Sequence, residues 1–480
     1  MLSKNLFSPD AWFCKVFGGA IPWLAFGALF PLAVAAETLA EAVRHALTQF
    51  PEIRAAAANR MAQDEAASQA RSAWLPTIDA TLGTGSERSS NTSTRILGSD
   101  QTLTRREAEV TLSQLIFDGG VTSGQVRRNE ARATGAGAQE ANTAEATAGR
   151  AAQAYVEVMR LRGLVQLARD NVSRHDQTLD LVAKLANSGR GRGADTQQTE
   201  ARLAFAEASL SQLRAQLVQA EAAFRHVVGL APGTLADPGE FVSKLPSNIE
   251  AAIADLEKLH PAVLVAMKEL EAAQADRETA RGRAVAPRLA LELGGSSNHD
   301  LDGVRGLSGD RYAMLRLRYN LYRGGADSAR IRETESRVDE ARANVAKALN
   351  DLQRDLRQSW DSLVQDRGRI PQLGRYVAAS NEVVVAYRAQ FSIGQRTMLD
   401  VLNAENELFT AKSSLYSGLS AVTAGELRVL ASMGRLIDAL GLQRPGDAGM
   451  ARAGGDASVG TTAGTKVGTS VGTSAGNQGQ

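Results

Sequence analysis

The stretch Gln114-Leu115-Ile116-Phe117-Asp118-Gly119-Gly120 decides the fold, because a similar stretch returns far downstream. The second copy reads Tyr319-Asn320-Leu321-Tyr322-Arg323-Gly324-Gly325, which places the two glycine pairs 205 residues apart. The same spacing of 205 residues separates Gly189 from Gly394, Asp195 from Asp400, Glu200 from Glu405 and Leu203 from Leu408. A constant spacing over about eighty residues predicts two tandem structural repeats.

Each predicted repeat has the same order of elements, and we place repeat one at 37–245 and repeat two at 246–442. A helix of about 35 residues comes first, followed by a β-hairpin, a very long helix, a turn containing Gly189 or Gly394, and a second shorter helix. The expected helices are Thr38–Trp74, Val121–Ser188 and Asp195–Val228 in repeat one, and Asn248–Arg283, Ala326–Ile393 and Asp400–Met433 in repeat two. Each long helix would extend for ~100 Å, and only a coiled-coil-like bundle would bury one side of it.

The clearest strand of the sequence leads into the second glycine pair. Its two faces are Leu315, Leu317 and Leu321 on one side, and Arg316, Arg318 and Asn320 on the other. This alternation predicts a hairpin strand with one apolar and one polar face. In a membrane the apolar face would contact lipid and the polar face would line a wet lumen. The alternative is a small soluble sheet that packs on the helices.

The number of strands favours an assembly of several chains. Two hairpins supply four strands, which are too few to close a barrel, and open strand edges are not tolerated in lipid. Three protomers would supply twelve strands, which lies within the range of outer-membrane barrels. We therefore expect a mainly α-helical chain with a transmembrane β-barrel, in which a homotrimer forms a channel that continues as a helical tunnel.

The two ends of the chain are expected to lie outside this fold. Lys4 and Lys15 precede an apolar run that ends in small residues at 33–36, so residues 1–36 are predicted to be a signal peptide. An uncleaved membrane anchor is the alternative. The single cysteine, Cys14, falls in this segment and lacks the context of an acylated cysteine. Residues 443–480, rich in Gly, Thr, Ser and Val, are predicted to form a disordered tail.

The composition argues against several other classes of function. The 54 Lys and Arg residues balance 53 Asp and Glu residues, so the chain shows no bias toward a nucleic-acid partner. The histidines are scattered without the spacing of metal ligands, and no catalytic constellation is present. They are His45, His175, His226, His260 and His299. We therefore expect no metal, no cofactor and no enzymatic activity.

The duplicated order of elements behind a signal peptide resembles the TolC family of outer-membrane factors over about residues 37–442. The most specific match is Phe391-Ser392-Ile393-Gly394-Gln395-Arg396-Thr397-Met398-Leu399-Asp400-Val401-Leu402-Asn403-Ala404-Glu405-Asn406-Glu407-Leu408. It is similar to the segment at the periplasmic tip of that family, and its final part resembles the type I secretion subgroup most. The resemblance implies a TolC-like trimeric channel-tunnel in the outer membrane, with its helical tunnel in the periplasm.

The resemblance also implies partners. Members of the subgroup work with a periplasmic adaptor protein and an inner-membrane ABC transporter, and they export a protein such as an RTX-type toxin or adhesin. The alternative within the family is the outer-membrane component of a multidrug efflux pump. Two other classes stay open, a soluble periplasmic coiled-coil adaptor and a periplasmic enzyme. The first does not explain two matched hairpins, and the second lacks a site.

The same resemblance assigns roles to residues near the tip. Asp400 corresponds to an acidic ring at the periplasmic entrance, and Asn403 stands where the family has a second acidic ring. Arg396 and Asp195 correspond to residues that hold the tip closed, and Phe391 replaces a tyrosine that would contact Asp195. From the residues alone, Asp400 is an N-cap of the following helix, and Arg396 is a solvated surface cation.

Overall fold

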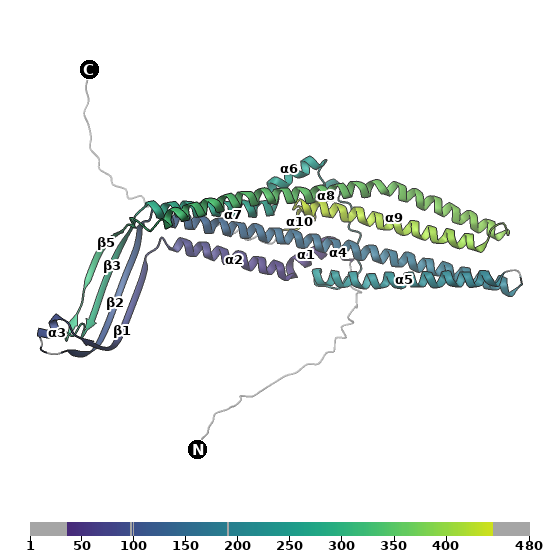
Figure 1. Ribbon diagram of the computed structural model, residues 1–480. Coiled ribbons are helices and arrows are strands. Elements are labelled where there is room, and N and C mark those ends of the chain that lie inside the picture. Colours follow the sequence, from purple (N-terminus) through teal and green to yellow (C-terminus); the bar gives the residue numbers. More distant parts are fainter. Residues whose placement is uncertain (1–35, 97, 99, 190–191, 445–480) are drawn as a thin grey trace, which may run out of the picture.

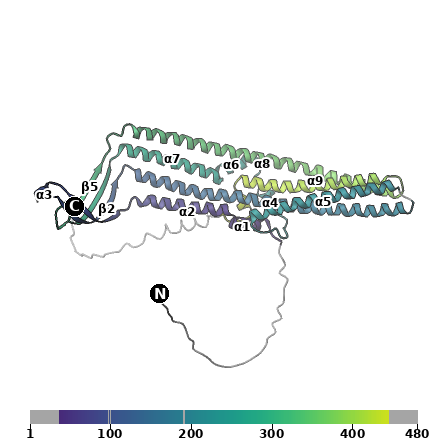
Figure 2. The ribbon, with the colours of Figure 1, turned by 60° about the horizontal axis from the view of Figure 1, so that its bottom comes forward.

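The computed structural model describes residues 36–444, apart from 97, 99 and 190–191, so the predicted signal peptide and tail lie almost wholly outside the described residues. The described chain is a long bundle of helices with a β-sheet at one end, as Figures 1 and 2 show. The prediction of a mainly α-helical chain with two hairpins is confirmed.

The sheet joins the two hairpins into one surface. Its strands are β1 (Thr77–Ser89), β2 (Gln101–Phe117), β3 (Arg288–His299) and β5 (Arg311–Arg318). They pair antiparallel in the order β1, β2, β3, β5, and the short β4 (Leu307–Ser308) pairs with the end of β3. In the described part of the chain, β1 and β5 therefore pair on one side only. The contact between the hairpins is made by β2 and β3, which belong to different repeats.

The register gives the sheet two chemically distinct faces, because residues opposite each other on neighbouring strands share a face. Cross-strand pairs such as Ile78 with Leu112 and Leu291 with Leu315 form an apolar face that crosses all four strands. The polar face carries ion pairs from Arg316 to Glu292 and from Arg105 to Glu87 and Glu107. The apolar face is exposed on the single chain, where Leu82 is 82% and Leu315 is 65% exposed.

The last strand is shorter than the sequence suggests. Strand β5 ends at Arg318, and residues 319–323 form an irregular connection to the glycine pair. The prediction that Asn320 and Leu321 belong to the strand was wrong. The partner strand explains the difference, because β3 begins at Arg288, directly opposite Arg318, and the residue before it is Pro287, which has no N–H to donate. Leu315 and Leu317 lie on the apolar face, and Arg316 and Arg318 lie on the polar face.

The long helices run from the sheet to the far end of the bundle. Helices α4 (Val121–Asn187) and α8 (Ala326–Ser392) each contain 67 residues and agree with the predicted bounds to within one residue. Each starts after a glycine pair in the left-handed conformation, with φ of +69° and +83° at Gly119 and Gly120 and of +60° and +83° at Gly324 and Gly325. A side chain would strain this backbone, so the pairs fix the direction in which each helix leaves its hairpin.

Shorter helices in series accompany the long ones, as Figure 1 shows. They are α1 (Leu39–Gln49), α2 (Pro51–Ser72), α5 (Gly193–Val228), α6 (Ile249–Leu259), α7 (Pro261–Val285) and α9 (Met398–Ser432). The remaining short elements are α3 (Thr92–Ile96), η1 (Val242–Lys244) and α10 (Leu436–Ala439).

Thr38–Trp74 and Asn248–Arg283 are not single helices, so this prediction was wrong. Each is interrupted before a proline, at Phe50 with φ −71° and ψ 126° and at His260 with φ −72° and ψ 126°. The proline disfavours helical geometry in the residue that precedes it, while it fits the first position of the next helix. Both repeats therefore contain the same break at the same place.

The main hydrophobic core lies where these breaks occur, about midway along the bundle. Tyr155 and Phe224 are fully buried there among apolar residues of α1, α4 and α9. The Tyr155 hydroxyl lies 2.7 Å from the carbonyl oxygens of both Glu37 and Ala236. It thereby holds the first described residues against the connection that follows α5.

The buried carboxylate of Glu145 lies at the edge of this core, against the last described residues of the chain. The Glu145 Oε2 atom accepts hydrogen bonds from the backbone N–H groups of Leu436 (3.1 Å) and Ile437 (3.4 Å), and its Oε1 atom lies 3.4 Å from Arg444 Nε. Burial raises the pKa of Glu145 to about 7, against the opposing effect of Arg444. The carboxylate thus fastens the last described residues of the chain to α4.

We predict that Glu145→Gln flattens the dependence of stability on pH. Because the pKa of Glu145 is raised in the folded chain, folding takes up a proton, and stability falls as pH rises from about 4.5 through about 7. The loss is ~3 kcal/mol for a shift of this size. Thermal unfolding at pH 5 and pH 8 should show a smaller difference for the variant than for the parent. Glu157→Gln, a more exposed change on the same helix, is the control. An equal pH dependence in all three proteins would contradict the prediction.

Candidate functional site at the tip of the helical hairpins

The end of the bundle opposite the sheet consists of two helical turns. One joins α4 to α5 and the other joins α8 to α9, and both lie at the same end in Figures 1 and 2. Gly189 and Gly394 are left-handed in these turns, with φ of +74° and +75°. These two glycines, which stand 205 residues apart in the sequence, therefore have the same backbone conformation. They end two hairpins, α4/α5 and α8/α9, that lie side by side.

Asp400 lies in the first turn of α9, at the third helical position. The residues alone predicted that it is the N-cap, and this prediction was wrong. The cap is Thr397, whose hydroxyl accepts from Asp400 N, while the Asp400 carboxylate accepts from Thr397 N at 3.3 Å. This reciprocal capping box satisfies two helix-end donors. Hydrogen bonds from Thr397 and the nearby Arg396 guanidinium lower the pKa of Asp400, which is partly exposed. The side chain is therefore an accessible carboxylate that stays ionised into the acidic range.

Arg396 makes its contacts inside the α8/α9 hairpin. Its Nε atom donates to Gln390 at 2.9 Å, its guanidinium lies 4.3 Å from the centre of the Tyr387 ring, and Nη1 lies 3.9 Å from Asp400. None of the polar contacts of Arg396 among the described residues involves Asp195. That residue lies in the first turn of α5, where its backbone carbonyl accepts from the Thr199 hydroxyl at 2.7 Å. One chain therefore does not bring the expected latch together.

Phe391 has a packing role in the structure. Its ring lies beside a buried cluster formed by Val182 of α4 and by Met398, Val401 and Leu402 of α9. This cluster brings the two hairpins into contact directly behind the turn. An apolar ring suits the position, although the hydroxyl that a tyrosine would contribute is missing.

A polar link between the hairpins near the tip joins a residue predicted from the sequence to one that was not. The Oδ1 atom of Asn403 on α9 accepts a hydrogen bond from Arg202 Nη2 on α5 at 2.9 Å. Asn403 was a candidate, but Arg202 was not. The sequence carries no local signal for Arg202, because its partner lies 201 residues away and depends on how two helices rotate against each other.

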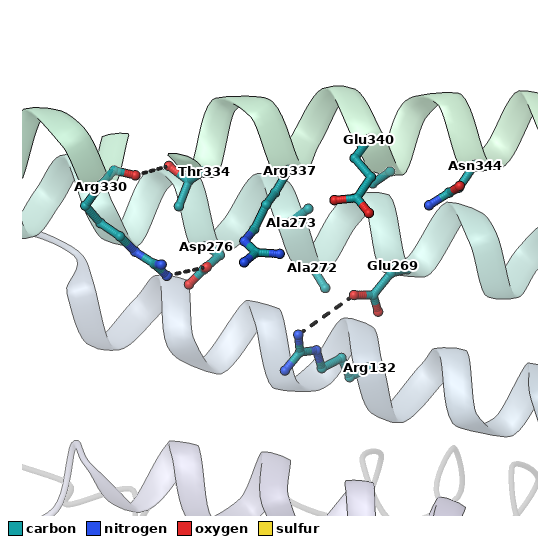
Figure 3. A pocket seen from close by; sticks show the side chains of 11 residues that line it. Arg132, Glu269, Ala272, Ala273, Asp276, Arg330, Thr334, Arg337, Glu340 and Asn344 are labelled. Carbon is teal, nitrogen blue, oxygen red and sulfur yellow. Dashed lines mark hydrogen bonds and ion pairs between the residues drawn. The ribbon is translucent and has the colours of Figure 1, made fainter. Parts of the chain in front are cut away.

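A charged cleft lies farther along the bundle, where α4, α7 and α8 meet, as Figure 3 shows. It has a volume of about 390 Å³, and its charged lining residues are Arg132, Glu269, Asp276, Arg330, Arg337 and Glu340. Arg330 pairs with Asp276 at 3.0 Å, Arg128 pairs with the same carboxylate at 3.2 Å, and Arg132 pairs with Glu269 at 3.8 Å. Opposite charges therefore pair across the helices. These ion pairs connect α4 of repeat one to α7 of repeat two, and α7 to α8.

Two further features bear on the kind of site. Across the described ranges, no group of three or more His, Cys, Asp or Glu side chains is placed to hold a metal ion. None of the described helices combines the length and the apolar character that a membrane span needs.

The arrangement of sheet, long helices and paired tips is shared with solved outer-membrane channels. The structure of the outer membrane protein VceC from Vibrio cholerae superposes with a TM-score of 0.71 at 18% identity, covering 83% of this chain and 96% of that one. The CmeC outer membrane channel of Campylobacter jejuni superposes with a TM-score of 0.73 at 13% identity, covering 86% and 88%. The fold is therefore that of a channel-tunnel.

The sequence defines the family. The model of the outer membrane efflux protein family matches residues 42–230 and again 252–435, and the chain belongs to this family. Among its relatives, the outer membrane efflux protein BepC of Brucella suis is 26% identical over 90% of this chain and 92% of that protein. The alkaline protease secretion protein AprF of Pseudomonas aeruginosa is 24% identical over 77% and 79%.

Membership of this family establishes the general function of the chain and its location in the cell. The chain is an outer-membrane channel protein of the TolC family that serves efflux or secretion, and it is not an enzyme. Both uses occur among the names of its relatives.

Proposed function

We propose that this chain is the outer-membrane channel of a type I secretion system that exports a protein. The observation that carries the proposal is the tip segment 391–408, whose final part, Leu402–Leu408, resembles the type I secretion subgroup. A relative named for the secretion of a protease supports it. In this function the chain works with a periplasmic adaptor and an inner-membrane ABC transporter.

We further propose that the working unit is a homotrimer. The apolar face of the sheet is exposed on one chain, and β1 and β5 each have an unpaired edge within the described residues. Such edges are removed when neighbouring copies pair through them. Three copies would then present the apolar face to outer-membrane lipid and place Arg316 and Arg318 toward the lumen.

At the other end of the trimer, the turns would meet around the axis and form the entrance. We propose Asp400 as its charged ring, because the carboxylate is accessible and ionised. Asn403 lies one turn farther along the same helix, and its hydrogen bond to Arg202 makes it part of the closing link. Arg396 and Asp195 form a latch only if they meet between chains.

The second candidate is drug efflux, which the relative BepC favours by its name. The test uses a Gram-negative host that lacks its own channel. The chain is expressed there with an ABC transporter, an adaptor and an RTX-type cargo, or with a proton-driven drug pump and its adaptor. We expect cargo in the medium and no gain of drug resistance. Resistance without cargo export would replace the proposal by the second candidate. An assembly-defective variant such as Leu315→Arg serves as the negative control.

We predict that Arg202→Ala loosens the tip more than Arg396→Ser does. The Arg202 hydrogen bond joins the two hairpins, whereas the contacts of Arg396 stay inside one hairpin. Loss of one such bond should raise the open probability roughly fivefold, and single-channel recording on reconstituted trimers measures it. A larger effect of Arg396→Ser would indicate that Arg396 forms a latch between chains.

A further inference from the structure

A buried ionisable group connects α8 and α9 near the tip. Glu405 of α9 is only 4% exposed, although it carries a carboxylate. Arg388 of α8 donates from Nε at 3.0 Å and from Nη2 at 2.6 Å, and both bonds go to the Oε1 atom. The other oxygen, Oε2, is buried and has no partner among the described residues. The Arg388 contact therefore leaves half of the carboxylate unsatisfied.

The opposing hairpin presents a second unsatisfied group. His175 of α4 is 2% exposed, and its Nδ1 atom is buried without a partner among the described residues. One helical turn earlier, Asn171 is also buried and has an unpartnered Oδ1 atom. Buried polar groups without partners are uncommon in folded proteins because each one costs free energy. Two such groups lie on α4, and a third, Glu405, lies on α9, where its charge acts on His175.

The charges around His175 come from every helix at this contact. Glu405 of α9 favours the protonated imidazole, whereas Arg174 of α4 and Arg202 of α5 oppose it. Arg388 of α8 is bound to Glu405 and reduces the effect of that carboxylate. Burial is the largest influence, and together these causes lower the pKa of His175. The closed contact therefore favours a neutral imidazole.

We propose that Glu405, held by Arg388, and His175 form an ionisable joint that positions the α8/α9 hairpin against α4, and that protonation of His175 releases the hairpin. This inference rests on the proposed function, in which the tip is the entrance of the channel. Glu405 and His175 are positioning residues, since they hold the helix that carries Asp400 and Asn403. The joint would let an acidic environment loosen the entrance without any change at the entrance ring itself.

The sign of the effect follows from the two states of the imidazole. When the hairpins separate, water reaches His175 and its pKa returns toward the ordinary value of about 6.5. The separated form then binds a proton more readily than the closed form does, so falling pH favours separation from about 6.5 downward. Each unit by which the closed state lowers the pKa allows up to a tenfold shift of the equilibrium.

The first measurement reports the geometry alone. Because the only cysteine is Cys14, in the predicted signal peptide, cysteines placed at the exposed positions Gln177 and Glu407 give one pair of spin labels in each chain of the full-length trimer. We expect the distance between the labels to lengthen in a larger fraction of molecules at pH 5.5 than at pH 7.5. In His175→Gln, which is polar but does not titrate here, the distance should be the same at both values. A shorter distance in acid, or an unchanged pH response in His175→Gln, would overturn the proposal.

The second measurement connects the joint to the channel. Single-channel conductance of the parent should rise between pH 7.5 and pH 5.5, and His175→Gln should remove this rise. Glu405→Gln leaves Arg388 without its carboxylate, and it should loosen the hairpin at both pH values. A pH-dependent distance without a change in conductance would support the joint and contradict the entrance at this tip. The two proposals therefore fail separately.

Discussion

Replacing Leu315 by arginine should prevent most of the protein from assembling in the outer membrane. Leu315 lies opposite Leu291 on the apolar face of the sheet and is 65% exposed on the single chain. If this face contacts lipid, an arginine there costs ~2–4 kcal/mol near the middle of the bilayer. Three copies in a trimer would each bear this cost. Heat-modifiable trimers in the outer-membrane fraction are the measurement, and we expect them to be nearly absent.

The neighbouring residue supplies a matched control. Met314 precedes Leu315 on the same strand and lies opposite Glu292, so its side chain belongs to the polar face. Met314→Arg adds the same charge at nearly the same depth but on the polar face, beside the Glu292 carboxylate that pairs with Arg316. We expect trimers at close to the parental level. If both variants lose assembly equally, the apolar face does not contact lipid, and the sheet is covered in some other way.

The extent of the long helices was predictable because its signals are local. A glycine pair stands before each of these helices and a glycine turn follows it, and both features need left-handed backbone that other residues avoid. The spacing of 205 residues then transferred each bound from one repeat to the other. The predicted bounds of α4 and α8 are correct to within one residue for this reason.

Other bounds depend on contacts that no local pattern records. Strand β5 ends at Arg318 because β3 offers no further partner, although the alternation continues to Leu321. The breaks at Phe50 and His260 had a local signal in the prolines that follow them. A proline also fits the first turn of a helix, so its presence alone does not distinguish one helix from two. The pairing of β2 with β3, which joins the repeats, requires the complete fold.

The tip shows the same division. The motif around Asp400 fixed the position of the turn and of the residues that follow it, since both lie within one short segment. The residues that contact them could not be predicted from the sequence. Arg202 is 201 residues from Asn403, and Arg388 reaches Glu405 only because α8 and α9 pack with one particular rotation. Spacing along the chain carries no information about that rotation.

Replacing Asp400 by alanine should lower the preference of the reconstituted channel for cations. In a trimer three carboxylates would surround a narrow, water-filled entrance, where like charges attract counter-ions. The ratio of cation to anion permeability should fall roughly fivefold, given the strength of charge interactions at a wet constriction. Because hydrogen bonds from Thr397 and the Arg396 charge lower the pKa of Asp400, its carboxylate is ionised at pH 7.5, where the measurement is made.

The capping box offers a way to separate the charge of Asp400 from its structural role. Thr397→Ala removes the N-cap at a cost of about 1 kcal/mol of helix stability, yet it leaves the Asp400 carboxylate in place. Reversal potentials measured in a salt gradient should therefore remain close to the parental value in Thr397→Ala and shift toward zero in Asp400→Ala. Asn403→Asp should increase the preference only slightly, because the new carboxylate would pair with Arg202. If Thr397→Ala and Asp400→Ala change the reversal potential alike, Asp400 acts through the helix end, and the charged ring lies elsewhere.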